Sequence, residues 1–367
     1  MKEKLKILYI GSLCSERLIS EMLEKSTGKP NLAAQKYHRL LVQGMALNKH
    51  EFDANIISVP EFVIKSKWKR LKLVQSEKEK GVKYTYAPIF LIPLLKKLII
   101  AIFISVKIVK WKFKSKQTKS IIVFDILNIN VSAVSVFISK ILKTKTVAVV
   151  TDLPSLMFVL QEKISKKDKV FSGFQNFMLR KVNAYVFLTE AMNTNINGDK
   201  KPYCIIEGVT DYNLKKAEKL KSKKKVKIFH YSGGLFEKFG VKALIDAFML
   251  LRDENIQLHL FGNGDLIHYI KRCCEKDERI FYFGYRSNNI VLENQKKSFL
   301  LINPRFTHED YTKYSFPSKT TEYMASGVPL LTTKLRGIPE EYFEYVYFFE
   351  EEGVQEYKEV MQKLLLM

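Results

Sequence analysis

Three side chains near the end of the chain have the types and spacing of an anion-binding site. Ser318, Lys319 and Glu322 lie close together in the stretch Lys313–Thr333. The serine is expected to cap a short helix over Thr320–Ser326, which a glycine ends. The first-turn N–H groups and the lysine ammonium would then form a cationic pocket suited to phosphate. The alternative is an ordinary connection in which the lysine and the glutamate are solvated.

Length and composition indicate a globular protein of two domains. The chain has 367 residues, 47% of them hydrophobic, which suits two packed cores. Its four cysteines and six histidines show no metal-binding spacing, so we expect metal independence and reduced thiols of a cytoplasmic protein. The first residues, MKEKLKILYIG, are interpreted as a buried strand rather than a signal peptide, because their apolar run is short.

The formal net charge of +23 is concentrated in the first half. Residues 1–200 hold 35 lysines and arginines against 15 aspartates and glutamates, whereas residues 226–367 hold 18 against 20. This asymmetry favours a first domain that meets an anionic surface. No nucleic-acid-binding motif accompanies the basic residues, so we expect that surface to be a membrane and not nucleic acid.

Short apolar strands alternate with helices along the first half of the chain. Strands are predicted at Leu5–Ile10, Ala54–Val59, Ile121–Asp125, Thr146–Val150 and Tyr185–Leu188. Helices are predicted at Leu32–Leu47, Val131–Leu142 and Val170–Val182. Parallel strands need crossover connections, and helices supply them, so the alternation predicts a parallel sheet covered on both faces.

A charged segment, DYNLKKAEKLKSKKK, interrupts this pattern at residues 211–225 and is predicted to link a domain over 1–210 to a domain over 226–367. Strands are predicted after it at Val226–Tyr231, Ile256–Phe261, Ile280–Phe283, Phe299–Asn303, Val328–Thr332 and Val346–Phe349. Helices are predicted at Val241–Leu251, from Gly264 to about Cys274, at Thr320–Ser326 and from Val354 onward. The expected fold class is α/β, with two Rossmann-like, doubly wound parallel-sheet domains facing across a cleft that binds ligand.

The stretch Pro88–Val109 fits a buried element poorly. It is mostly apolar, but its longest uncharged run, Leu98–Val106, is far short of the roughly 20 residues that span a bilayer. Trp111 and Phe113 alternate with lysines directly after it, and Trp68 stands in an earlier basic stretch. Aromatic and cationic side chains suit an anionic membrane interface, on which this segment is predicted to lie. The alternative is a buried helix with a solvated basic end.

Five blocks of the second half occur in a recognisable order. They are YSGGLFEKFGVKALIDAF (231–248), LHLFGNGD (258–265), FYFGY (281–285), LLINPR (300–305) and YSFPSKTTEYMASGVPLLTT (314–333). Together they resemble the family 4 glycosyltransferases, which have the two-Rossmann GT-B fold, and are similar to bacterial members that build capsular polysaccharide or exopolysaccharide. In the first half the resemblance rests on Gly11, on TDLP (151–154) and on IIEGVTD (205–211).

The resemblance implies that the second domain holds a nucleotide sugar, usually a UDP-sugar. Glu322 matches the family glutamate that typically binds the ribose hydroxyls, while its usual partner glutamate is replaced by Tyr314. Ser318, Lys319 and Thr320 match the helix start that faces the diphosphate. The implied donor-binding residues are Gly11, Gly233, Gly234, Gly262, Tyr285, Arg305, Tyr314, Ser315, Ser318, Thr320 and Glu322.

Some of these positions also have ordinary structural interpretations. Tyr285 sits where family members commonly contact the nucleobase, although a core aromatic would be equally ordinary there. Gly262 either permits the close approach of a ligand or forms a plain turn. Gly11 and Ser12 are expected to form the loop beneath the diphosphate.

Three residues are implied as catalytic by the resemblance: Lys238, Lys319 and Asp152. Gly234 stands where the family has an arginine, and Arg305 or Lys319 is expected to compensate. Lys238 matches a lysine that grips the phosphates, unless it is merely solvated at a helix start. Asp152 is expected either to serve the acceptor or the sugar, or to cap the turn before a proline.

The expected function is retaining, metal-independent transfer of a sugar from a nucleotide sugar, with no cofactor. The expected acceptor is a polyprenyl-diphosphate-linked oligosaccharide for surface polysaccharide, reached from the cytoplasmic face of the cell membrane, to which the protein would bind peripherally. One alternative is a nucleotide-sugar 2-epimerase, which shares the fold. Another is a non-catalytic scaffold subunit with the GT-B fold, which the replaced glutamate keeps open.

Overall fold

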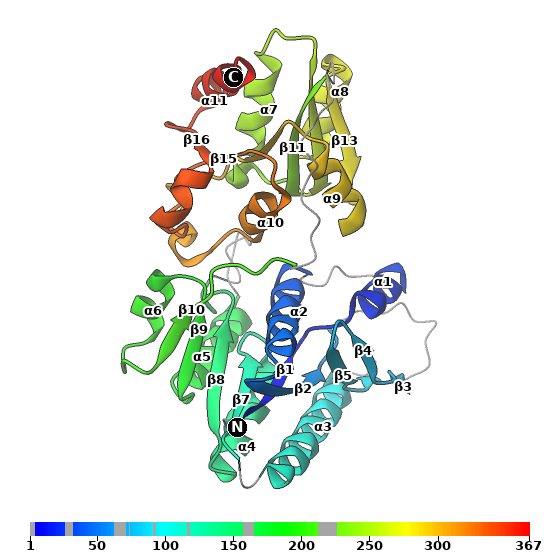
Figure 1. Cartoon of the computed structure of the whole chain (residues 1–367), viewed down its shortest axis with the longest axis vertical. Helices are drawn as coiled ribbons and strands as arrows, with labels where there is room; N and C mark the ends of the chain where they lie inside the picture. Colours follow the sequence, from blue (N-terminus) through cyan, green and yellow to red (C-terminus); the bar gives the residue numbers. More distant parts are fainter. Residues whose placement is uncertain are drawn as a thin grey trace. The chain divides into compact units, whose positions relative to one another are not determined.

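The computed structural model describes residues 4–25, 32–61, 71–72, 74–90, 93–115, 118–156, 165–211 and 226–367. They form two compact units, Met1–Val209 and Thr210–Met367, each built around its own sheet (Figure 1). Most of the predicted linker, residues 212–225, lies outside the described residues.

The first unit contains an eight-stranded sheet in the order β10-β9-β8-β7-β1-β2-β5-β4. Its strands are β1 (Leu5–Gly11), β2 (Phe52–Ser58), β4 (Glu77–Glu79), β5 (Val82–Tyr86), β7 (Ser120–Asp125), β8 (Lys145–Val150), β9 (Ala184–Phe187) and β10 (Tyr203–Ile205). Neighbouring strands run parallel, apart from the β4–β5 hairpin at one edge. Two short strands, β3 (Leu71–Lys72) and β6 (Ile89–Phe90), pair separately.

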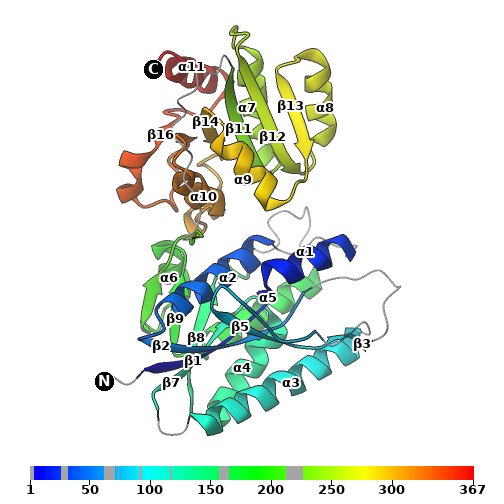
Figure 2. The same ribbon diagram turned by 45° about the vertical axis from the view of Figure 1, so that its right-hand side comes forward.

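Helices cover both faces of this sheet. They are α1 (Glu16–Lys25), α2 (Leu32–Leu47), α3 (Pro93–Lys114), α4 (Ile129–Ile141), α5 (Lys166–Leu179) and α6 (Glu190–Ile196). The connection from β1 to β2 runs toward the β4 edge of the sheet. The connections from β7 to β8 and from β8 to β9 run toward the opposite, β10 edge. Because such crossovers are right-handed, α1 and α2 lie on one face and α3, α4 and α5 on the opposite face, as Figures 1 and 2 show for α1 to α4.

The second unit contains a six-stranded sheet in the order β13-β12-β11-β14-β15-β16. Its strands are β11 (Lys227–Gly234), β12 (Ile256–Asn263), β13 (Ile280–Gly284), β14 (Leu300–Asn303), β15 (Leu330–Thr332) and β16 (Tyr347–Phe348), all paired in parallel. Its helices are α7 (Val241–Met249), α8 (Ile267–Lys276), α9 (Asn288–Lys296), α10 (Ser318–Ser326) and α11 (Val354–Leu365). Three short 3₁₀ segments join them: η1 (Glu237–Phe239), η2 (Asp310–Tyr314) and η3 (Glu340–Tyr345).

Each face of the second sheet has its own apolar cluster. The larger one joins strand residues such as Phe229 and Leu258 to Phe248 of α7, Ile270 of α8 and Tyr357 of α11. A smaller one, made of Leu301, Tyr323, Val328 and Leu330, holds α10 against the other face. Two parallel sheets with helices on both faces confirm the predicted α/β fold class.

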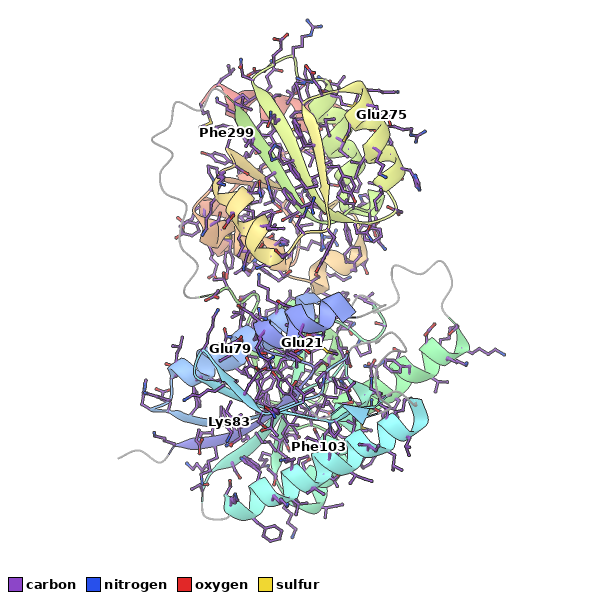
Figure 3. All side chains as sticks on the ribbon, turned by 90° about the vertical axis from the view of Figure 1, so that its right-hand side faces the viewer. Glu21, Glu79, Lys83, Phe103, Glu275 and Phe299 are labelled. Carbon is purple, nitrogen blue, oxygen red and sulfur yellow. The ribbon has the colours of Figure 1, made fainter. Side chains whose placement is uncertain are left out.

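Helix α3 contains most of the stretch that was predicted to lie on a membrane, and it has two apolar faces. Ile100, Ile104 and Ile108 recur at helical spacing and are at most 2% exposed, so they pack inward. Leu98 and Ile102 are each 56% exposed on another face. Figure 3, in which Phe103 is labelled, shows side chains projecting from both sides of this helix.

The alternative of a buried helix therefore describes only one face of α3. Trp111, which was expected at a membrane interface, belongs to the buried face with 8% exposure, so that expectation was wrong. Trp68 lies outside the described residues. Among the helices that the structure describes, none has both the length and the apolar content that crossing a membrane requires.

Candidate functional site

The strand order of the second sheet reverses between β11 and β14, and ligands of doubly wound folds bind at the carboxyl ends of strands at such a point. Gly233 and Gly234 end β11, and Arg305 follows β14. Helix α10 follows β14 in the chain and packs against it. The fold thus brings together, at one edge of one sheet, most of the residues that were predicted to bind the donor.

Helix α10 begins at Ser318, two residues before the predicted start at Thr320. Its N-cap is Pro317, and Ser318 is the exposed first residue of the helix, with no capping side chain present. The prediction that Ser318 caps the helix was therefore wrong. Proline is well suited to this start because its φ is fixed near the observed −65°. The helix ends, as predicted, at Gly327, which adopts the left-handed conformation with φ of 75°.

Lys319 and Glu322 form an ion pair on α10. The Nζ atom of Lys319 lies 2.6 Å from Oε1 of Glu322, whose side chain is only 4% exposed. Thr320 is also buried, and its hydroxyl accepts a bond from Nδ2 of Asn303, 3.4 Å away. The carboxylate, the ammonium and the helix start are therefore concentrated within one turn.

Gln295 bonds this carboxylate and is itself held by a network with Ser232 and Tyr323; the sequence-based prediction did not include these three residues. Gln295 of α9 donates from Nε2 to Oε1 of Glu322 (2.9 Å) and to the hydroxyl of Ser232 (3.2 Å). The backbone N–H of Ser232 donates to the Tyr323 hydroxyl at 2.8 Å. Ser232 and Tyr323 fall inside the recognised blocks. Gln295 gives no sequence signal, because α9 is polar and was not predicted.

His230, on β11, is fully buried beside this network. Its ring stacks on Phe261 with centroids 5.0 Å apart. Neither ring nitrogen has a hydrogen-bond partner within the described part of the chain. Burial lowers the pKa of His230 to about 3, and the charge of Lys319 and the neighbouring His259 act in the same direction. A neutral imidazole therefore lies close to the Lys319–Glu322 pair.

The glycines at this edge are needed first for close backbone packing. A Cβ on Gly262, where φ is +136°, would lie 1.8 Å from the carbonyl oxygen of Gly233. A Cβ on Gly234 would meet the rings of Phe236 and Phe239 at 2.8 and 2.9 Å. These contacts support the plain structural interpretation of Gly262, because its backbone already approaches another strand end.

Arg305 reaches the neighbourhood of Gly234 through Phe239. Its guanidinium lies 4.4 Å from the centre of the Phe239 ring, the ring that a side chain on Gly234 would strike. Whether Arg305 compensates for the arginine missing at Gly234 stays a prediction. Lys238, on η1, is partly desolvated, which lowers its pKa, while Glu309 and Asp265 oppose this shift.

Three other predicted donor residues of the second unit, Tyr285, Tyr314 and Ser315, lie after β13 and at the end of η2. Tyr285 follows β13 and is 54% exposed, so it is not the core aromatic of the alternative interpretation. Tyr314 ends η2, and Lys313 Nζ lies 5.0 Å from the centre of its ring. The carbonyl oxygen of Ser315 lies 2.3 Å from where a Cβ on Gly337 would be, so this loop packs tightly.

A second polar cluster occupies the corresponding point of the first sheet, where the order reverses between β1 and β7. Asn128 caps α4 and donates from Nδ2 to Ser12 Oγ (3.1 Å) and to Glu61 Oε1 (2.6 Å). Burial of the Glu61 carboxyl group raises its pKa to about 7, and the negative charge of Asp125 contributes a smaller part of this shift. Burial alone would raise the pKa of Asp125, but the charge and hydrogen bond of His38 outweigh it and lower that pKa. None of these residues except Ser12 was singled out from the sequence.

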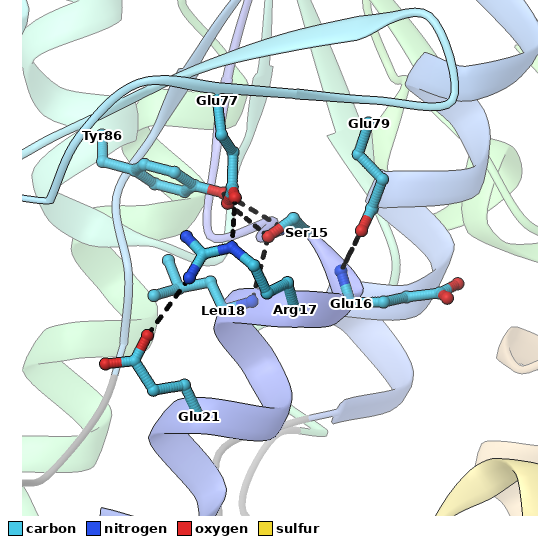
Figure 4. Close-up of polar contacts among 8 residues, drawn as sticks. All are labelled: Ser15, Glu16, Arg17, Leu18, Glu21, Glu77, Glu79 and Tyr86. Atoms are coloured by element: carbon cyan, nitrogen blue, oxygen red, sulfur yellow. Dashed lines mark hydrogen bonds and ion pairs between the residues drawn. The ribbon is translucent and has the colours of Figure 1, made fainter.

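The start of α1 is capped by carboxylates from the β4–β5 hairpin (Figure 4). Both carboxylate oxygens of Glu79 accept from the backbone N–H of Glu16, each at 3.1 Å. Glu77 accepts from Nε of Arg17 at 2.6 Å and from the hydroxyl of Ser15. The loop predicted to lie beneath the diphosphate, which begins at the end of β1, thus leads into a helix start that the protein itself caps.

Gly11 and Asp152 both follow strands of the first sheet. A Cβ on Gly11 would lie 3.3 Å from Leu13 Cδ2 and 3.4 Å from Asp125 Cβ, so the strand end is closely packed. Asp152 accepts a bond from the N–H of Leu153 at 2.9 Å, as the turn-capping alternative requires. Burial nevertheless raises its pKa to about 6, which suits a group that exchanges protons near neutral pH.

No group of three or more histidine, cysteine, aspartate or glutamate side chains in the described residues is arranged to hold a metal ion. Metal independence stays a prediction, because it concerns the reaction.

Solved structures with this arrangement of two parallel sheets define the fold class. Sucrose-phosphate synthase from Thermosynechococcus elongatus superposes with a TM-score of 0.63 at 13% identity, covering 98% of this chain and 90% of that one. Anabaena Alr3699/HepE in complex with UDP superposes with a TM-score of 0.60 at 15% identity, again covering 98% and 90%. The lipopolysaccharide outer core galactosyltransferase WaaB gives 0.57 at 12% identity with the same coverage. The chain therefore has the GT-B fold.

The family comparison covers the second unit. Residues 213–367 match the model described as "Glycosyl transferases group 1". Gly233, Lys319 and Glu322 lie within the matched residues. Comparison with curated protein sequences finds no match.

Proposed function

We propose that the protein is a retaining, metal-independent glycosyltransferase that moves a sugar from a nucleotide sugar to a membrane-associated acceptor. The donor is a UDP-sugar, and the acceptor is an oligosaccharide linked to polyprenyl diphosphate, used for surface polysaccharide. The protein acts at the cytoplasmic face of the cell membrane.

The observation that carries this proposal is the start of α10. It places the N–H groups of a helix, the ammonium of Lys319 and the buried carboxylate of Glu322 at the point where the sheet order reverses. Helix starts and ammonium groups bind phosphate, and a carboxylate can accept both hydrogen bonds of a ribose diol. A nucleoside diphosphate combines these two features. The match of this domain to the group 1 glycosyltransferases and the UDP bound to Anabaena HepE support the same ligand.

Catalysis follows from stabilising the departing diphosphate. The bond between the anomeric carbon and the diphosphate oxygen breaks, the acceptor oxygen bonds to that carbon on the same face, and the acceptor proton passes to the departing diphosphate. Lys319, Lys238 and Arg305 supply positive charge where negative charge develops. Asp152, with its raised pKa, serves as a polar group for the acceptor hydroxyl.

The exposed face of α3 supports the membrane-bound acceptor. Leu98, Ile102 and Val106 expose 56%, 56% and 44% of their surface along one side of the helix. Exposed Lys97 and Lys110 lie on the same helix. An apolar stripe flanked by lysines suits a helix that rests on an anionic bilayer.

The test is incubation of the protein with a panel of UDP- and GDP-sugars, with and without a polyprenyl-diphosphate-linked acceptor. We expect one UDP-sugar to raise the melting temperature and to be consumed, with transfer to the lipid-linked acceptor and the α or β configuration of the donor retained. Chelation of divalent metal should leave the rate unchanged.

Other outcomes distinguish the alternatives. Isomerisation of the sugar while it stays attached to the nucleotide would identify a 2-epimerase. Failure to bind any nucleotide sugar would identify a scaffold subunit and overturn the proposal.

A further inference from the structure

A groove of about 700 Å³ opens on the face of the first sheet that α3, α4 and α5 cover. Its wall is mainly apolar, formed by Ala101, Ile129, Ala133, Val134, Val170, Phe171 and Phe174. The polar residues that line it are Lys97, Lys166, Lys167 and Asn130, and no described acidic residue contributes to the lining. Its size is that of a small-molecule site.

The groove lies toward the carboxyl edge of the parallel sheet. Helices of such a sheet run opposite to the strands, so their N-terminal halves lie at the edge where ligands bind. All three helices line the groove with residues from their first two or three turns, such as Lys97 of α3 and Lys167 of α5. At this edge Lys96 acts electrostatically on Glu61, which is bonded to Asn128.

Ile129 and Asn130 therefore connect two features. They line the groove, and they directly follow Asn128, which belongs to the polar cluster at the reversal point of the first sheet. Apolar side chains, lysines and a cluster of hydrogen-bonding groups are thus neighbours at this edge of the sheet. These three environments suit a hydrocarbon chain, a phosphate and a sugar.

We propose that the groove holds the hydrocarbon chain of the lipid acceptor, with its phosphate at Lys97, Lys166 and Lys167. The inference rests on the proposed function and deepens it by assigning the acceptor's lipid to named residues. Charge complementarity selects an anionic headgroup, because the ionisable side chains of the lining are all lysines. The position of the groove beside the Asn128 cluster selects the acceptor over a lipid of the surrounding bilayer, which would need only the exposed face of α3.

The first experiment measures binding of farnesyl phosphate to the full chain, with farnesol and inorganic phosphate as comparisons. A133W adds a bulky ring inside the groove, and V170D places a carboxylate at a groove position that is 74% exposed and therefore tolerant of change. I141W is the matched control, on the same helix but outside the lining, at a site 75% exposed. We expect A133W and V170D to weaken binding at least about tenfold, and I141W to change it less than about twofold.

The second experiment tests the lysines. K166E/K167E reverses two charges at the rim, and both glutamates would lie in the first turn of α5, where negative charge is tolerated. The control K140E/K145E makes the same change of net charge at exposed positions away from the groove. K166E/K167E should lower the affinity for farnesyl phosphate at least about tenfold and leave the weaker affinity for farnesol unchanged. The control K140E/K145E should leave both affinities unchanged.

Three results would overturn the inference. One is that the wild type does not bind farnesyl phosphate, or that A133W and V170D both bind it as tightly as the wild type does. Another is full competition by inorganic phosphate alone, which would indicate a surface anion site. The last is loss of binding to phosphatidylglycerol vesicles in A133W with farnesyl phosphate binding intact, which would make the groove a bilayer anchor. A wild type that binds UDP but no farnesyl phosphate leaves the proposed function standing.

Discussion

The ammonium of Lys319 lies 2.6 Å from Oε1 of Glu322, and the same carboxylate oxygen accepts a bond from Gln295. The pair stands one turn into α10, where the phosphate and ribose of a nucleotide are proposed to bind. A bound diphosphate would share the ammonium with Glu322.

Replacing the two residues separately should distinguish their roles. K319M should lower the affinity for UDP by about tenfold to a hundredfold and the affinity for uridine far less. The reason is that a charge-assisted bond to phosphate contributes about 1.5–3 kcal/mol. E322Q should weaken UDP and uridine alike by about tenfold, since the ribose is common to both. Calorimetric titration measures both ligands, and K276M on the exposed end of α8 is the control. Equal loss of uridine in K319M would contradict the assignment.

Asp152 should set the acid limb of the pH profile. Burial raises its pKa to about 6, so the carboxylate that accepts a hydrogen bond from the acceptor forms only above that pH. The rate kcat/KM should therefore rise through about pH 6 and level off. D152N should lower the plateau by at least about tenfold and remove this limb.

The control for this profile is D199N, an exposed position of the same unit, which should keep the limb and the plateau. If D152N lowered thermal stability but left the limb in place, Asp152 would serve only to cap its turn.

His230 should make the protein sensitive to acid. Its pKa in the fold is about 3, against an ordinary value of 6.5, so the unfolded chain binds the proton more readily. The contribution of the neutral His230 side chain to the free energy of unfolding is fully present above about pH 6.5. It is lost as the pH falls toward 3. H230F should remove up to about 1.4 kcal/mol per pH unit from the slope of the unfolding free energy in this window.

Urea denaturation at a series of pH values measures that slope. F261L disturbs the same ring stack without a titrating group, so it should lower stability at every pH and keep the slope. An identical slope in H230F and the wild type would show that the buried imidazole is not the source.

Two glycines should respond in opposite ways to alanine. Gly240 has φ of +72°, and a Cβ there would lie 1.8 Å from the carbonyl oxygen of Pro304, so G240A should destabilise by more than the roughly 1–2 kcal/mol of the left-handed conformation. Gly173 lies within α5 with nothing near its Cβ position, so G173A should stabilise by about 0.5–1 kcal/mol. Thermal unfolding of both variants measures the contrast. Similar shifts would contradict the packing around Gly240.

Elements with strong periodicity could be predicted from the sequence. Helix α2 covers the predicted Leu32–Leu47, and the strands that were predicted lie within a few residues of their expected positions, whereas the parallel strands β5 and β10 were not predicted. The β4–β5 hairpin was not predicted because both strands are short and β4, EKE, is fully charged. Helix α9 was not predicted because its sequence, NNIVLENQK, is mainly polar. These elements are held by tertiary contacts, such as the one from Glu79 to α1, that no local pattern records.

In the candidate site, too, some residues could be predicted from the sequence and others could not. Lys319 and Glu322 could be found because they lie on one short helix within a recognisable block. Gln295 and Asn128 could not, because each acts through partners far away in the sequence, 27 and 67 residues from Glu322 and Glu61 respectively. The N-cap was misplaced by one residue because serine is a common cap, while here the fixed φ of Pro317 starts the helix.

The carboxylates of Glu77 and Glu79 have a consequence for the stoichiometry of nucleotide binding. Both units have a parallel-sheet architecture that binds nucleotides in other proteins. In the first unit, however, the carboxylates of Glu77 and Glu79 already occupy the start of α1. An incoming phosphate would find the N–H group of Glu16 already bonded to the carboxylate of Glu79. A titration with UDP should therefore saturate at one molecule per chain, leaving the first unit for an uncharged sugar acceptor and its lipid.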